Sequence, residues 1–78
     1  MLSKSIVEFM SDPSVSPVVD ALLVAQIVFN SRFITSNDPE YRKVLRTMHK
    51  LAYEDDVLDS MWFQGTNQRV WWLKARLR

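Results

Sequence analysis

With 78 residues the chain has room for one domain, which we expect to span residues 1–78. Hydrophobic residues make up 47% of it, enough for a core and with apolar surface left over for self-association. The formal net charge is +1, so the overall charge excludes no class of partner, and its distribution along the chain matters more.

The sequence contains no cysteine. Small secreted domains usually need disulfides and zinc fingers need thiolate ligands, so both classes are excluded. A reducing, cytoplasmic location is the expectation that follows. Glu8 and Asp12 interrupt any apolar stretch at the start, which argues against a signal peptide. The longest apolar run, residues 18–29, is too short to cross a bilayer, which takes about 20 residues, so no membrane contact is expected.

The first half of the chain predicts two helices separated by a turn. Residues 4–10 form a short apolar helix that a Pro-containing turn ends. Ser16 and Pro17 have the composition of a helix start, so a second helix is expected from Pro17 to about Asn30. Because this helix is apolar almost all round, it is typical of a buried element or of a homodimer interface. The interface residues predicted on it are Leu23 and Ile27.

Asp38 and Pro39 form a second start signal, and they predict a helix over about residues 39–54. Plotted at 100° per residue, this segment separates an apolar face from a basic face that carries no acid. The apolar face consists of Tyr41, Val44, Leu45, Met48, Leu51 and Ala52. The basic face consists of Arg42, Lys43, Arg46, His49 and Lys50. We expect Leu45, Met48 and Leu51 in the core.

The last third of the chain predicts a β-hairpin. Residues 57–63 and 69–73 are rich in β-branched and aromatic side chains, and Gly65 lies in the polar stretch between them. Side chains alternate along a strand, so Trp71 and Trp72 should point to opposite faces, with one of them in the core. We expect Trp71 to be buried. The protein-interface residues predicted here are Trp62 and Trp72.

A basic helix, an acidic stop, a strand, a Gly-containing polar loop and an aromatic returning strand follow one another. This order resembles the closing half of a winged helix-turn-helix domain, with residues 41–51 and 69–73 carrying the resemblance. It covers residues 38–75, about half the chain, and includes no invariant motif. It implies an α+β, winged-helix-like fold of two to three helices followed by a C-terminal β-hairpin, with residues 39–54 as recognition helix and the hairpin as wing.

Two features depart from that family's pattern. The family usually has a short helix and a tight turn before the recognition helix, whereas here the preceding apolar segment is long and about seven residues separate it from Asp38. The hairpin loop is nearly uncharged, so it adds hydrogen-bonding groups without Coulomb attraction for phosphates.

We therefore predict a small protein that binds double-stranded DNA, a transcriptional regulator or accessory factor of a size that suits a phage or mobile element. Arg and Lys pair with phosphates, and Arg pairs bidentately with guanine. The predicted DNA-binding residues are Arg42, Lys43, Arg46, His49, Lys50, Asn67 and Arg69.

The alternative is a non-enzymatic protein-interaction module, a small dimer or inhibitor that docks on a larger protein machine. Its basic helix face would then be solvated or would meet an acidic protein. His49, the chain's one histidine, has no cysteine or carboxylate constellation in its sequence neighbourhood. Neither reading needs an enzyme, and we expect no catalytic, cofactor or metal site.

Overall fold

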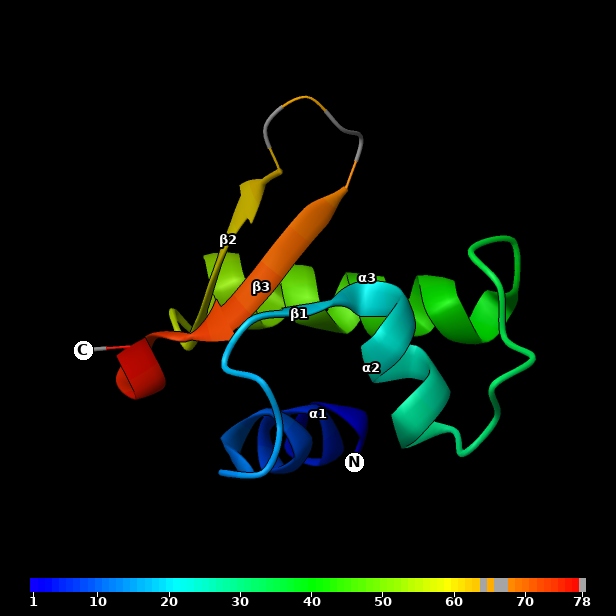
Figure 1. The fold of residues 1–78 in the computed structure, drawn as a ribbon, viewed down its shortest axis with the longest axis horizontal. Coiled ribbons are helices and arrows are strands. Elements are labelled where there is room, and N and C mark those ends of the chain that lie inside the picture. The colour runs from blue at the N-terminus through cyan, green and yellow to red at the C-terminus, as the bar shows by residue number, and fades with distance from the viewer. Residues whose placement is uncertain (64, 66–67, 78) are drawn as a thin grey trace.

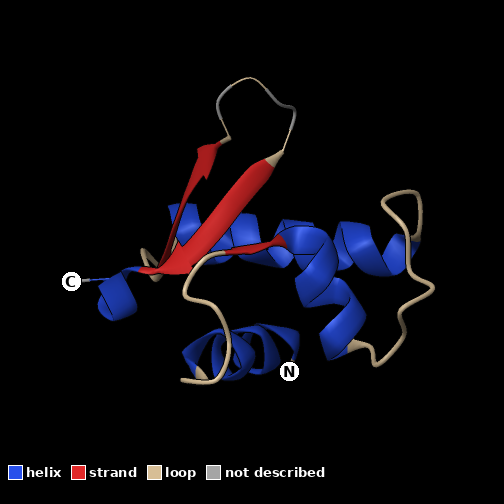
Figure 2. Ribbon diagram, viewed as in Figure 1, coloured by secondary structure: helices blue, strands red, loops and turns tan. Residues whose placement is uncertain are grey.

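The structure is a computed structural model that describes residues 1–63, 65 and 68–77. Its elements are α1 (Leu2–Ser11), β1 (Val19–Asp20), α2 (Ala21–Val28), α3 (Pro39–Tyr53), β2 (Leu58–Trp62), β3 (Arg69–Leu73) and a final 3-10 turn, η1 (Lys74–Leu77). Figure 1 shows α3 running behind the strands, α1 at the far side of the molecule from the hairpin loop, and α2 beside them. The three α-helices and the antiparallel sheet of the described residues confirm the α+β class (Figure 2).

The β2–β3 hairpin forms where it was predicted, but a third strand joins it. The strand order is β1-β3-β2, so β3 lies in the middle and pairs antiparallel with both neighbours. Trp71 is opposite Val19 of β1 on one side and Ser60 of β2 on the other. Gly65 has a φ of 82°, the positive value expected of it. β1 has only two residues, which is too short for a strand period to be visible in the sequence.

The predicted bounds of the second helix, Pro17 to about Asn30, are wrong. The helix observed there, α2, covers only Ala21–Val28. The Ser16 hydroxyl accepts the Val18 N–H, and so it closes a local turn without capping a helix. The cap of α2 is Asp20, whose carboxylate accepts the Leu23 N–H at 2.7 Å. Pairing of β1 with β3 holds the backbone extended up to Asp20, and a charged carboxylate is a strong N-cap.

α1 is slightly longer than residues 4–10, the range predicted for it, and ends at Ser11. Behind it, the Asp12 carboxylate accepts hydrogen bonds from the Ser14 N–H at 2.9 Å and from the Ser14 hydroxyl at 2.8 Å. These bonds, and to a smaller degree the charge of Arg76, hold the pKa of Asp12 below its ordinary value. The turn predicted at this position is therefore stabilised by its own side chains.

The core lies between the three helices and one face of the sheet, and Trp71 is its largest fully buried side chain. Met48 and Leu51 are buried as predicted, whereas Leu45 is only half-buried, because it faces an open hollow beside the hairpin. The remaining buried residues come from every layer: Ile6, Met10, Val19, Ala21, Val24, Ala25, Ile34, Val44, Leu58 and Leu73.

The chain after β3 is fastened to the first helix. Arg76 donates one hydrogen bond to the Met10 carbonyl at 2.9 Å and another to the Val15 carbonyl at 2.8 Å. Lys74 forms an ion pair with Asp56, in the turn between α3 and β2. These two side chains connect η1 to the C-terminal end of α1 and to the turn that follows α3.

Candidate nucleic-acid interface

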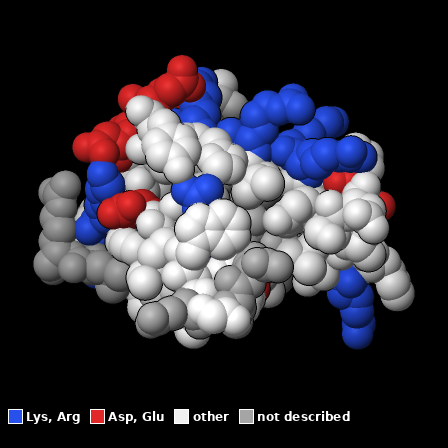
Figure 3. Space-filling view, turned by 90° about the horizontal axis from the view of Figure 1, so that it is seen from above, with Lys and Arg blue, Asp and Glu red and all other residues white. Residues whose placement is uncertain are grey.

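Four basic side chains project from the side of α3 that faces away from the core. Val44, Met48 and Leu51 anchor the opposite side, which fixes the rotation of the helix. The exposed side chains are Arg42, Lys43, Arg46 and Lys50, and we call them the outer cations. Figure 3 shows Lys and Arg gathered in one area at the upper right of that view, with acidic residues at its lower border.

The outer cations have almost no partners among the residues that the structure describes. Arg42 donates one hydrogen bond to the Asn37 carbonyl at 3.2 Å. The side chains of Lys43, Arg46 and Lys50 make no hydrogen bond to the described residues, and the one ion pair in the described part of the chain is Lys74 with Asp56. The positive charge of this face is therefore available to an anion from outside.

His49 was assigned to the basic face, but the structure places it at the edge of that face, half-buried against the hairpin. Its ring meets the edge of Trp71 at 5.2 Å and stacks on Tyr53 at 5.6 Å between centroids. Burial lowers the pKa of His49, and the positive charge of Arg69 lowers it further. A neutral imidazole in this position adds no charge to the outer cations.

Arg69, also predicted to contact DNA, is held by the protein itself. Its Nε donates to the Ser60 hydroxyl at 2.9 Å, and Nη2 donates to the Tyr53 hydroxyl. The guanidinium carbon lies 4.4 Å from the ring centre of Trp71 and 5.7 Å from that of Trp62. This aromatic cage around Arg69 was not predicted from the sequence. The hairpin register could have revealed it, because Arg69 is directly opposite Trp62 and two residues before Trp71.

The hairpin itself exposes apolar side chains. Trp62 is 61% exposed, and Met61 and Phe63 are exposed to a similar degree. Trp72 is half-buried. Asn67, a predicted DNA-binding residue, lies outside the described residues. The structure therefore brings the outer cations, His49, Arg69 and Trp62 to one side of the molecule and leaves Trp72 in a different setting, opposite Asp59.

The other two predicted interface residues lie on α2. Leu23 is 40% exposed and Ile27 is 51% exposed, so α2 is not buried all round. Phe29 and Phe33 follow in the connection to α3 and are also exposed. These four side chains leave an apolar surface on α2 and on the connection that follows it.

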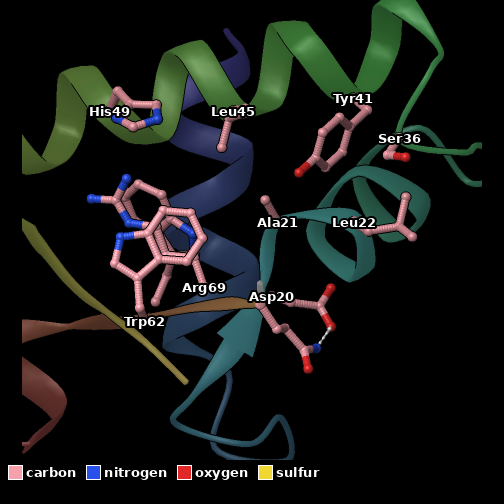
Figure 4. Close-up of a pocket in the computed structure, with 11 residues that line it drawn as sticks. Asp20, Ala21, Leu22, Ser36, Tyr41, Leu45, His49, Trp62 and Arg69 are labelled. Atoms are coloured by element: carbon pink, nitrogen blue, oxygen red, sulfur yellow. Dashed lines mark hydrogen bonds between the residues drawn. The ribbon is translucent and has the colours of Figure 1, made fainter. Parts of the chain in front are cut away.

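A hollow of about 400 Å³ opens between α3 and the hairpin. Tyr41, Leu45 and His49 reach into it from α3, and Trp62 and Arg69 stand across from them (Figure 4). Its other lining residues are Asp20, Ala21, Leu22, Ser36, Gln68 and Trp71. The indole N–H of Trp71 is buried and has no acceptor among the described residues.

Scans against protein-family models, curated proteins and solved structures found no match to the chain. Within the described range, no helix has the length and apolar character needed to cross a bilayer. No cluster of three or more His, Asp or Glu residues suited to a metal ion occurs among the residues that the structure describes.

Proposed function

We propose that the protein binds double-stranded DNA and places α3 in the major groove. The observation that carries the proposal is the set of four outer cations on one 15-residue helix, exposed and without acidic partners among the described residues. A helix of this kind fits the major groove, where its Arg side chains read guanine while its Lys side chains meet phosphates.

The arrangement around α3 supports the winged-helix resemblance. α2 has eight residues, so the helix before α3 is short, as it usually is in that family. It packs against α3, and the hairpin follows α3 directly. The connection from Phe29 to Asp38 remains longer than a tight turn. We propose Arg46, at the centre of the outer cations, as the base-reading residue, with Lys43 and Lys50 on phosphates.

A fluorescence-anisotropy titration with a labelled 20-base-pair duplex at low salt tests the proposal. The double variant Arg42→Ala/Arg46→Ala should lose at least tenfold in affinity, because two phosphate or base contacts are removed. The matched control is Lys4→Ala/Arg32→Ala, which also removes two exposed positive charges, but away from α3. It should change the affinity less than twofold. Equal losses in the two variants would contradict the assignment of α3 as the interface.

A second candidate is a protein-interaction role, in which two copies associate through α2. The exposed side chains of Leu23, Ile27 and Phe33 favour it, because clustered apolar surface of this kind marks interfaces. Light scattering at micromolar concentration should give about twice the 9.2 kDa chain mass. A monomer mass would remove this candidate and leave DNA binding untouched.

We further propose a cytoplasmic location and a role as transcriptional regulator or accessory factor, of phage or mobile-element type. The cysteine-free composition supports a reducing compartment. The small size and the exposed basic helix support a protein that works by binding.

A further inference from the structure

The hollow beside α3 has chemistry that duplex binding does not use. Its volume of about 400 Å³ lies within the range of small-ligand pockets, roughly 300–1,000 Å³. An indole and a guanidinium stand on one side of it, and a phenol and a leucine on the other. Flat π-faces with a few polar groups at one end suit a planar heteroaromatic ring.

The aromatic side of the hollow is firmly positioned. Arg69 is stacked on the buried Trp71 and hydrogen-bonded to Ser60, so it holds a fixed orientation. Trp62 covers Arg69 from the outside and still exposes 61% of its surface. Tyr53, at the end of α3, is 69% exposed and is tied to the same guanidinium by its hydroxyl. A ring that stacks here meets surfaces that are already ordered.

Polar groups lie at the other end of the hollow. The Tyr41 hydroxyl makes no hydrogen bond to the described residues. The Asp20 carboxylate accepts the Leu23 N–H, and the Gln68 amide donates to its second oxygen at a long 3.4 Å. The Ser36 hydroxyl completes this end (Figure 4). These are donors and acceptors of the kind that contact the edge of a nucleobase.

The hollow also borders the outer cations. Tyr41, Leu45 and His49 form one row on α3 at spacings of four residues. Arg42, Arg46 and Lys50 form the next row around the helix, since each residue advances 100°. A polyanion whose backbone follows the second row therefore has its side groups next to the hollow.

We propose that this hollow binds an unpaired nucleobase of a single-stranded or locally opened nucleic acid, with the adjoining phosphates on Arg42 and Arg46. The inference rests on nucleic-acid binding by α3 and names a further substrate for that surface. A base inside a duplex has both faces covered by its neighbours and cannot offer one to Trp62. An unstacked base can, and such stacking on an aromatic side chain strengthens single-strand binding without regard to sequence.

The test compares a 12-nucleotide single strand, the same strand with one central abasic site, and a blunt duplex of equal length, each titrated by anisotropy at the same salt. Trp62→Ala should weaken single-strand binding by about tenfold more than duplex binding, the loss typical of one stacked base. Trp62→Phe is the matched control. It keeps an aromatic ring at this exposed position, so it should retain most of the single-strand affinity of the parent. The abasic strand should bind the parent protein more weakly than the intact strand.

The outcomes separate this inference from the proposed function. If the parent binds duplex through Arg42 and Arg46 but Trp62→Ala changes single-strand and duplex affinity equally, the hollow is not a base site, and duplex binding stands. If the parent binds the single strand in a Trp62-dependent way and no duplex, the base site stands and duplex binding fails. If it binds neither nucleic acid, both fail.

Discussion

Two groups of basic side chains occupy the molecule in different ways. The outer cations on α3 project into solvent. Together their side chains make one hydrogen bond to the described residues, which Arg42 donates to the Asn37 carbonyl. The second group, Arg69, Lys74 and Arg76, we call the inner cations, because each is held by hydrogen bonds or an ion pair within the fold. The inner cations thus stabilise the fold through their contacts within it. The outer cations have few such contacts among the described residues, so their charge remains available for binding.

The largest effect should come from Arg76. Replacing it with Ala removes two hydrogen bonds from a charged group to the Met10 and Val15 carbonyls, both partly buried. We expect the free energy of unfolding to fall by about 2–3 kcal/mol, and the Tm by about 10 °C or more for a domain of this size. Thermal and urea denaturation measure both. Arg76→Lys, which keeps the charge but not the forked geometry, should fall in between, and an unchanged Arg76→Ala would contradict the assignment.

A smaller loss is expected at Arg69, because its hydrogen bond to Tyr53 is exposed, whereas both hydrogen bonds of Arg76 are partly buried. Arg69→Ala removes the bonds to Ser60 and Tyr53 and the stacking on Trp71, and it should lower the free energy of unfolding by about 1–2 kcal/mol. The control Tyr53→Phe removes one of those bonds and should lose less than half as much. If the two variants unfold alike in urea, the bond to the Tyr53 hydroxyl accounts for the whole effect, and the stacking on Trp71 contributes little.

His49, which contacts the same tryptophan as Arg69, should make the stability of the fold depend on pH. The pKa of His49 is lowered in the folded state, chiefly by burial and then by Arg69, so the folded protein binds fewer protons than the unfolded chain around pH 6. The stabilisation is therefore present above the unfolded pKa, about 6.5, and is lost as the pH falls through it. We expect the Tm to drop between pH 7.5 and 5.5. His49→Gln, which removes the one histidine of the chain, should flatten that change.

The smallest effect on stability should come from the outer cations. Lys43→Ala should leave the free energy of unfolding within about 0.5 kcal/mol, because the side chain is exposed and has no partner in the described structure. The same variant should reduce the slope of log affinity against log salt for duplex DNA by about 0.9, the value for one phosphate contact. A clear drop in Tm, with an unchanged salt slope, would reverse the roles of the two groups.

The outer cations could be predicted from the sequence, because they lie on a helix whose apolar residues repeat over a long segment. α3 begins at Pro39 as its start signal indicates, and its buried positions Val44, Met48 and Leu51 repeat at helical spacing over fifteen residues. Its exposed basic face follows from that rotation alone. The hairpin was also predictable, because two aromatic, β-branched stretches flank the chain's one glycine.

What could not be predicted depends on contacts between distant residues. From the sequence, Val19 and Asp20 are predicted to belong to an apolar helix. In the structure they are extended, because they pair with β3. His49 lies at the border between the two faces of α3, so only the position of Trp71 decides that it is half-buried. The sequence shows that Arg69 and Arg76 are charged. Their partners, at Tyr53 and Met10, come from other elements of the fold.

The central position of β3 also has a consequence for the order of folding. Val19 and Trp71, paired across β1 and β3, are 52 positions apart, whereas β2 and β3 are joined by a short loop. Closing a long loop is entropically harder than closing a short one, so the hairpin can form early and β1 can dock only afterwards. Until then the indole of Trp71 lacks one wall of its surroundings. The slowest step in reaching the native state should therefore be the arrival of residues 19–20 at the edge of a hairpin that already exists.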